Sequence, residues 1–325
     1  FYRERKRLTL ANILKKTPYR RHYGTRSDSL SGYRRHQLPC RPGGQSRAAA
    51  GKHLPLYGSF GAGRLYGCSD QALRDYLAVH SGYQIRAVSL GFPATVDRSR
   101  RHVLQAPNIP GLPDDLPVCD ILEEALGLPV FLERDVNLLL CYDLQDLRLP
   151  KDATIIGVYF GTGIGNSIYI GGKFHNGANG VAGELGHIPR LGQQTLCGCG
   201  NACCIEPLGG GRKLSELCET EFSGTPIKEI YLRHGTSESV RQQVEVMAAA
   251  VATEVNILDP DYVVLGGGLL QMEGFPMDYF RERIFFHTRK PYPLLGLKLL
   301  FARPGQENGI IGAGLHGWEL LGNKA

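Results

Sequence analysis

The fold is decided by residues 154–165, which read Thr154-Ile155-Ile156-Gly157-Val158-Tyr159-Phe160-Gly161-Thr162-Gly163-Ile164-Gly165. The run up to Phe160 is apolar and rich in β-branched side chains, which predicts a buried strand, and the glycines after it predict a tight turn. A second strand is expected over 166–170. The segment therefore predicts a β-hairpin, and not the strand-to-helix setting of a Rossmann fingerprint or a P-loop.

Strands and helices alternate on both sides of this hairpin. The clearest helix spans 237–258, because apolar side chains recur there at spacings of three and four. They are Val240, Val244, Met247, Val251, Val255 and Leu258. The pattern also predicts helices over 71–79, 118–126 and 135–143, and strands over 86–93, 129–133 and 262–265. This alternation predicts an α/β protein.

Length and composition allow two domains with a substantial core. The chain has 325 residues, of which 42% are hydrophobic and 21% charged, so global disorder is not expected. Its apolar runs are far shorter than the ~20 residues that span a bilayer, and no signal segment opens it. We expect a cytoplasmic protein without a membrane partner.

The positive net charge comes from the first part of the chain. Residues 1–64 hold 15 basic and two acidic residues, a net charge of +13, whereas the remaining residues carry −7. A basic segment can indicate nucleic-acid binding. Residues 1–66 nevertheless show no apolar periodicity, and a helix-turn-helix domain would need it. We therefore expect no nucleic-acid partner and an anomalous, poorly ordered segment over 1–66.

Cysteines cluster around residue 200. Cys197, Cys199, Cys203 and Cys204 lie close together among glycines, and His187 precedes them by ten residues. Three thiolates and one imidazole are the ligands of a closed, tetrahedral zinc site. Cys203 and Cys204 compete for the last position, and the spacing does not separate them. Free thiols in a reducing cytosol are the alternative, since a disulfide would need an oxidising compartment.

Three carboxylates are candidates for the chemistry. Glu184 and Glu206 flank the cysteine cluster, so a zinc ion that fixed this loop would also fix both carboxylates as acceptors for substrate hydroxyls. Without such an ion they would be solvated loop residues. Asp135 opens a predicted helix after a strand end, where position alone favours an ordinary helix N-terminal Asp over a catalytic one.

Two glycine segments follow predicted strands. Residues 161–165 can present backbone N–H groups to a phosphate, because glycine permits positive φ and close approach, but a plain hairpin turn has the same composition. Residues 266–268 can admit a nucleotide to the backbone, although a strand-end turn also favours glycine.

An ordered set of motifs resembles the ROK family of bacterial sugar kinases and repressors, from about residue 70 to the C-terminus. The motifs are Gly91-Phe92-Pro93-Ala94, Pro107-Asn108-Ile109-Pro110, Arg134-Asp135-Val136-Asn137, Gly161-Thr162-Gly163-Ile164-Gly165, Gly180-Val181-Ala182-Gly183-Glu184-Leu185-Gly186-His187, the cluster from Cys197 to Glu206, and Leu265-Gly266-Gly267-Gly268. The resemblance implies an actin-like (ribonuclease H-like) fold, in which two α/β domains close over a sugar and Mg-ATP.

The resemblance also implies roles for individual residues. Asp135 matches the catalytic base that takes the proton of the sugar 6-hydroxyl as it attacks the γ-phosphate. The implied sugar-binding residues are Asn108, Arg134, Glu184, His187 and Glu206. The implied ATP-binding residues are Gly161, Thr162, Gly163, Gly266, Gly267 and Gly268. The implied zinc ligands are His187, Cys197, Cys199 and Cys204, which decides against Cys203.

Two departures from the family pattern shape the expected function. Arg134 stands where most family kinases have Asn, which with the neighbouring motifs points to D-allose as the sugar. The Asp-x-Gly-x-Thr phosphate loop expected near the start of the family fold is not found in residues 1–90. We interpret residues 1–66 as the product of a displaced reading frame, and expect sugar binding with impaired phosphoryl transfer.

The expected domains are an anomalous segment over 1–66, a small α/β domain over 67–125 joined by the C-terminal helix at about 308–325, and a large α/β domain over 126–307. We expect a homodimer, as is usual for relatives of this kind. A sugar-responsive repressor of the same family and a sugar-binding protein without catalysis are the alternative functions.

Overall fold

The computed structural model describes residues 12–15 and 74–322, apart from 76, 80, 81, 83, 107, 108, 110 and 111. Asn108, expected to contact the sugar, therefore lies outside the described residues. So does the expected anomalous segment 1–66, except for residues 12–15.

The larger sheet has the strand order β10-β9-β6-β7-β8. Its strands are β6 (Ile155–Phe160), β7 (Ile164–Ile170), β8 (Lys173–Phe174), β9 (Tyr262–Gly266) and β10 (Leu299–Phe301). Strands β6 and β7 pair antiparallel through residues 161–163, which confirms the predicted hairpin. Strand β9 runs parallel to β6, with Tyr159 opposite Gly266. Both glycine segments therefore leave the sheet at the same edge.

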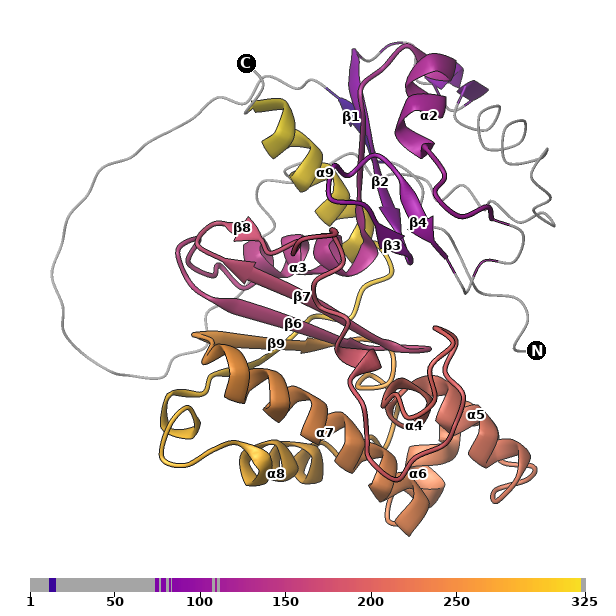
Figure 1. The fold of residues 1–325 in the computed structure, drawn as a ribbon, viewed down its shortest axis with the longest axis vertical. Helices are drawn as coiled ribbons and strands as arrows, with labels where there is room; N and C mark the ends of the chain where they lie inside the picture. The colour runs from indigo at the N-terminus through magenta and orange to yellow at the C-terminus, as the bar shows by residue number, and fades with distance from the viewer. Residues whose placement is uncertain are drawn as a thin grey trace, which may run out of the picture.

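Helices cover both faces of the larger sheet (Figure 1). Helices α7 (Glu238–Leu258) and α8 (Met277–His287) lie on one face, and α3 (Asp135–Asp146) lies on the other. The predicted apolar stripe of α7 is confirmed, because Val240, Val244, Met247, Val251 and Val255 are fully buried. Helix α7 ends at Asp259, which takes a left-handed conformation before Pro260. Shorter helices α4 (Glu206–Gly209), α5 (Gly211–Glu219) and α6 (Ile230–His234) extend this layer.

The smaller sheet has the order β1-β2-β5. It consists of β1 (Asn12–Lys15), β2 (Ile85–Phe92) and β5 (Val130–Arg134), and is covered by α2 (Val118–Leu126), the hairpin of β3 (Thr95–Val96) and β4 (Val103–Gln105), and the C-terminal helix α9 (Asn308–Gly322). We call this assembly the smaller lobe and the layers around the larger sheet the larger lobe.

The expected domain boundary at residue 126 needs correction. Strand β5 lies beyond it and yet pairs parallel with β2, from Val88 opposite Val130 to Phe92 opposite Arg134. All five residues of β5 are buried, which is what a strand covered on both faces of a sheet requires. The smaller sheet therefore reaches Arg134.

Helix α3 joins the two lobes. It begins at Asp135 directly after β5, and it packs closely on α9, where a Cβ on Gly312 would lie 1.8 Å from the carbonyl oxygen of Leu138. Two buried hydrogen bonds fix α3 on the larger sheet. Tyr159 Oη donates to Asp143 Oδ2 at 2.7 Å, and Ser167 Oγ donates to Asn137 Oδ1 at 2.7 Å.

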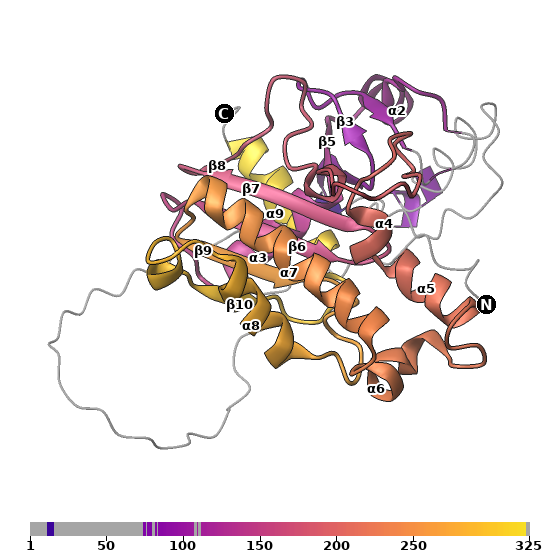
Figure 2. The same ribbon diagram turned by 60° about the horizontal axis from the view of Figure 1, so that its bottom comes forward.

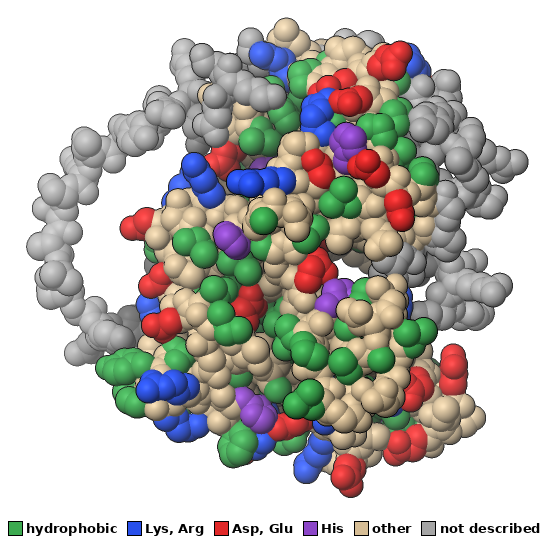
Figure 3. Space-filling model, viewed as in Figure 1, with side chains coloured by type: hydrophobic (Ala, Val, Ile, Leu, Met, Phe, Trp, Pro, Cys, Tyr) green, Lys and Arg blue, Asp and Glu red, His purple; other side chains and the backbone are tan. Residues whose placement is uncertain are grey.

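Acidic and basic side chains of the described residues are interspersed over the face drawn in Figure 3. None of the helices in the described part of the chain combines the length and the apolar character needed to cross a lipid bilayer.

The aromatic core under α8 gives a test of the fold. Phe280 is fully buried and meets Phe160 edge-to-face at 5.8 Å, whereas Phe285, on the same helix, is 42% exposed. We expect Phe280→Ala to lower the free energy of unfolding by ~3–5 kcal/mol because it leaves a cavity. Phe285→Ala should cost less than ~1 kcal/mol. Urea denaturation of both variants checks this, and equal losses would contradict the packing described.

Candidate active site

Three consecutive charged residues mark the junction of β5 and α3. Glu133, Arg134 and Asp135 end an apolar strand and begin a helix. The Glu133 side chain is 3% exposed, and its Oε1 accepts hydrogen bonds from the backbone N–H of Arg134 at 2.8 Å and from Asn137 Nδ2 at 2.9 Å. Its Oε2 lies 3.4 Å from Arg100 Nε. Burial of Glu133 and Arg134 requires such partners, since an unpartnered buried charge is strongly unfavourable.

Asp135 combines a helix N-terminus with a low-polarity environment. Its Oδ1 accepts a hydrogen bond from the backbone N–H of Val136 at 2.8 Å. Burial raises the pKa of Asp135 to about 6, although the Val136 N–H and the nearby Arg134 guanidinium act in the opposite direction. Gly91 makes this packing possible, because a Cβ there would lie 2.8 Å from Leu138 Cδ1. A carboxylate with a pKa near neutrality is suited to accept a proton from a substrate.

Arg134 is paired with Glu184. Its Nη2 donates to Glu184 Oε1 at 2.8 Å, and its Nη1 donates to the carbonyl oxygen of Ala182. The Arg134 side chain is 8% exposed and that of Glu184 is 35% exposed, so the carboxylate is the accessible end of the pair. Both residues were expected to contact the sugar. In the structure Arg134 lies on the buried side of Glu184, and Glu184 is the more exposed of the two.

His187 connects Glu184 to the cysteine cluster. It ends the short 3-10 helix η1 (Leu185–His187), and its Nε2 lies 3.4 Å from Glu184 Oε2. Its Nδ1 lies 3.5 Å from Cys197 Sγ on the other side of the ring. An imidazole held by a carboxylate through one nitrogen is the usual arrangement of a metal-ligating histidine.

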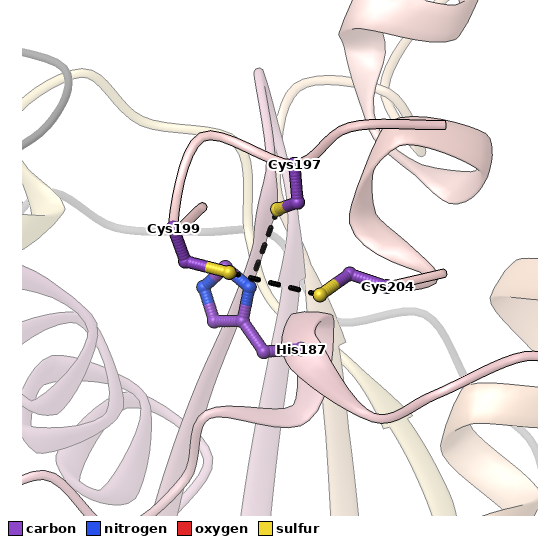
Figure 4. A group of neighbouring side chains, drawn as sticks. All are labelled: His187, Cys197, Cys199 and Cys204. Atoms are coloured by element: carbon purple, nitrogen blue, oxygen red, sulfur yellow. Dashed lines mark hydrogen bonds between the residues drawn. The ribbon is translucent and has the colours of Figure 1, made fainter. Parts of the chain in front are cut away.

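The four expected metal ligands converge (Figure 4). The ligand atoms of His187, Cys197, Cys199 and Cys204 all lie within 4.8 Å of one another, and Cys199 Sγ lies 3.7 Å from Cys204 Sγ. A tetrahedron with zinc–sulfur bonds of ~2.3 Å has edges of ~3.8 Å, so these separations fit a zinc ion. Burial raises the pKa of the Cys204 and Cys197 thiols, so a cation would be needed to hold them as thiolates. Cys203 lies outside this group.

Glu206 links the cysteine segment to the first glycine segment. As the first residue of α4, it accepts a hydrogen bond from the backbone N–H of Ile164 at 3.2 Å through Oε2. A Cβ on Gly163 would lie 2.2 Å from this Oε2, and one on Gly186 would lie 3.2 Å from it. A side chain at Gly163 would therefore displace the carboxylate from this position, and one at Gly186 would crowd it.

The glycine edge of the larger sheet holds a cavity of about 230 Å³. Gly266 and Gly267 line it together with apolar side chains, among them Leu270, Met277 and Phe301. Gly267 has a φ of +96°, and a Cβ there would lie 2.3 Å from the carbonyl oxygen of Phe160. Gly161 closes the neighbouring hairpin turn by donating to the carbonyl oxygen of Gly163 at 3.0 Å, and Thr162 is exposed at its tip. Gly268 continues the strand-end turn after Gly267.

Sequence reasoning overlooked two residues near this site. Glu133 is a buried partner of Asn137 and Arg100, and the pattern Glu133-Arg134-Asp135 after an apolar strand could have indicated it. Arg100 bonds to the carbonyl oxygen of Gly180, 80 positions along the chain, and nothing in the local sequence indicates that contact.

The chain is similar in sequence to known sugar kinases. A family model described as "ROK family" matches residues 74–316. Glucokinase of Streptomyces coelicolor is 30% identical over 224 residues, which cover 62% of this chain and 70% of that protein. N-acetyl-D-glucosamine kinase of Vibrio cholerae is 32% identical over 247 residues, which cover 70% of this chain and 78% of that protein.

Solved structures extend the likeness to the fold. ROK hexokinase from Thermus thermophilus aligns with a TM-score of 0.68 and 28% identity, covering 83% of this chain and 90% of that one. A ROK family transcriptional regulator, a homologue of the E. coli MLC protein, aligns with a TM-score of 0.69 and 20% identity, covering 81% of this chain and 70% of that one. At this identity the second likeness shows the fold alone.

The raised pKa of Asp135 means that ionisation of this side chain lowers the free energy of unfolding. Above pH 6 the folded chain must hold a half-buried, poorly solvated carboxylate, whereas the cost falls towards pH 4 and disappears well below it, where the group is protonated in both folded and unfolded chains. We expect Asp135→Asn to raise the free energy of unfolding by ~2 kcal/mol at pH 8 and by much less at pH 4. Denaturation at both pH values measures this, with exposed Asp152→Asn as the control. A gain that does not depend on pH would contradict the assignment.

Proposed function

Because the chain belongs to the ROK family, we propose that it is an ATP-dependent sugar kinase that transfers the γ-phosphoryl group to the 6-hydroxyl of a hexose. The observation that carries this proposal is Asp135, a half-buried carboxylate with a pKa of about 6 at the start of α3. Its neighbours Arg134 and Glu184 form an ion pair whose carboxylate is accessible, as a sugar-binding group must be.

Asp135 acts as the base. In the ionised form it accepts the proton of the 6-hydroxyl while the hydroxyl oxygen bonds to the γ-phosphorus and the bond to ADP breaks. Because the transition state of phosphoryl transfer is loose, orientation of the hydroxyl contributes as much as proton removal. The hydrogen bond from the Val136 N–H fixes one oxygen of the carboxylate and leaves the other for the hydroxyl.

Glu184, His187 and Glu206 hold the sugar hydroxyls. The Glu184 carboxylate is restrained on two sides, by Arg134 and by His187, and Glu206 is restrained by the Ile164 N–H. We propose that His187, Cys197, Cys199 and Cys204 hold a zinc ion, which makes the loop rigid rather than taking part in the chemistry. Restrained carboxylates lose little conformational entropy when they bind a ligand.

ATP binds at the glycine edge. The cavity beside Gly266 and Gly267 has the apolar walls that an adenine ring favours, and Gly268 continues this segment. The turn at Gly161, Thr162 and Gly163 lies next to it, since β6 and β9 pair in parallel, and it is placed to receive the phosphates. Mg²⁺ arrives with the nucleotide.

D-allose is our first candidate for the sugar. The proposal rests on Arg134, which takes the place of the usual Asn, and on the sequences of residues 91–94 and 180–189. The relatives described above are named for glucose and N-acetylglucosamine, so these sugars are the competing candidates. Arg134 influences the choice through Glu184, because its guanidinium is bonded to that carboxylate and is almost fully buried.

A kinase is favoured over a ROK repressor because Asp135 and the paired glycine segments serve phosphoryl transfer.

The homodimer, the cytoplasmic location and the domain assignment outside β5 stay predictions.

The proposed activity is tested with the purified chain, ATP and a sugar panel of D-allose, D-glucose, D-mannose, N-acetylglucosamine and N-acetylmannosamine. We expect phosphorylation of one sugar, with a rate that rises with pH as Asp135 ionises near pH 6. Asp135→Asn should lower turnover at least ~100-fold while isothermal titration still detects the sugar.

Phosphorylation that survives unchanged in Asp135→Asn would contradict the role of the base. Sugar binding without turnover in the parent chain would support the sugar site and locate the deficiency in the phosphate loop expected before residue 90. Neither binding nor turnover with any sugar would refute the proposal.

The zinc proposal is tested by two neighbouring cysteines. We expect one zinc ion per chain by plasma mass spectrometry. Cys204→Ser should abolish it and weaken sugar binding, because Glu184 and His187 lose their support. Cys203→Ser is the matched control, since Cys203 lies outside the cluster, and it should keep both properties. Equal zinc content in the two variants would refute the assignment.

A further inference from the structure

We propose that Arg100 is a positioning residue of the sugar site, which fastens the segment 176–184 of the larger lobe to the smaller lobe and so sets the place of Glu184. This inference rests on the proposed sugar-binding role of Glu184. It assigns a role to a residue in a turn of the smaller lobe, remote in sequence from every other residue of the site.

The turn that carries Arg100 is built to hold one conformation. It connects β3 and β4, and Asp97 accepts hydrogen bonds from the backbone N–H groups of Ser99 at 2.9 Å, Arg101 at 2.8 Å and His102 at 2.7 Å. Burial alone would raise the pKa of Asp97, but these bonds and that of the Ser99 hydroxyl outweigh it and lower the pKa to about 2. Arg100 itself has a φ of +59°. The turn therefore directs the Arg100 side chain inward.

The Arg100 guanidinium joins three parts of the structure. Its Nη1 donates to the carbonyl oxygen of Gly180 at 2.9 Å and to that of Val96 at 3.2 Å. Its Nε lies 3.4 Å from Glu133 Oε2, and the two side chains are 15% and 3% exposed. The opposite charges attract each other strongly because both side chains are largely shielded from water, and this attraction helps to hold the guanidinium in place. The carbonyl of Gly180 is thereby tied to the residue that precedes Arg134.

The backbone of Gly180 packs directly against the same turn. Its φ is +87°, and a Cβ there would lie 2.5 Å from the carbonyl oxygen of Val96 and 2.5 Å from the carbonyl carbon of Asp97. The backbone of the larger-lobe segment therefore rests directly on the smaller-lobe turn. The contact depends on the absence of a side chain as well as on the hydrogen bond.

Gly180 is only four residues from Glu184 of the proposed sugar site. Between them, the carbonyl oxygen of Ala182 accepts a hydrogen bond from Arg134 Nη1, and the Glu184 carboxylate accepts one from Arg134 Nη2. Arg100 and Arg134 thus hold the segment at two points, Arg100 at Gly180 and Arg134 at residues 182–184. Loss of the first point would leave Glu184 held by Arg134 and His187, while the backbone around Gly180 would lose its hydrogen bond to the smaller lobe.

The inference is tested with Arg100→Met and Arg100→Lys, and Arg98→Met serves as the matched control because Arg98 is an exposed arginine of the same turn. We expect Arg100→Met to weaken binding of the sugar that binds best to the parent chain about tenfold, which is ~1.4 kcal/mol. ATP binding should change less than about twofold. Arg100→Lys should fall between Arg100→Met and the parent chain, and Arg98→Met should match the parent chain. Isothermal titration gives both affinities.

Hydrogen–deuterium exchange provides a readout that does not depend on activity. Backbone amides of peptides covering 176–184 should exchange faster in Arg100→Met than in Arg98→Met. If Arg100→Met does not fold, Gly180→Ala replaces it, because this variant keeps the Arg100 charge. Gly180→Ala should show the same weaker sugar binding and the same faster exchange over 176–184. Sugar affinity within twofold of the parent chain, together with unchanged exchange over 176–184, would overturn the proposal.

A parent chain that binds none of the sugars would refute the proposed function and not this inference. The exchange comparison alone would then decide whether Arg100 fastens the segment.

Discussion

Adjacent charges at the end of β5 are the constraint on which the site depends. Glu133 and Arg134 are buried side by side and Asp135 follows them half-buried, so other parts of the chain must supply partners. The turn between β3 and β4 supplies Arg100, α3 supplies Asn137, and the segment before His187 supplies Glu184. Asp135 accepts a hydrogen bond from its own helix and has a raised pKa. This carboxylate is the one suited to chemistry.

The glycines around the site determine how closely its halves approach. Glu206 lies against Gly163 and Gly186, so one carboxylate touches both the turn proposed for phosphates and the segment proposed for the sugar. Gly267 allows the end of β9 to lie on Phe160, which brings the cavity proposed for ATP beside the same turn. Side chains at these positions would separate groups that must meet for phosphoryl transfer, where distance controls the rate.

Periodicity and local motifs were sufficient for the elements themselves. The hairpin of β6 and β7, the buried stripe of α7 and the bounds of α2 agree with the sequence patterns, because these features depend on neighbours a few residues apart. The assignment of β5 to the smaller sheet could not be predicted, since a fully apolar strand indicates that both faces are covered but not which sheet covers them. Arg100 was overlooked because an arginine in a polar turn is ordinarily solvated, and its partner is distant in sequence.

The packing of α9 has a consequence for how the protein is made. This helix lies against α3 and the smaller sheet, so the smaller lobe is built from residues at both ends of the described chain (Figure 1). A ribosome synthesises the whole larger lobe before it reaches α9. The larger lobe can therefore begin to fold during translation. The faces of β2 and α3 that α9 covers in the finished protein remain exposed until this helix has been synthesised.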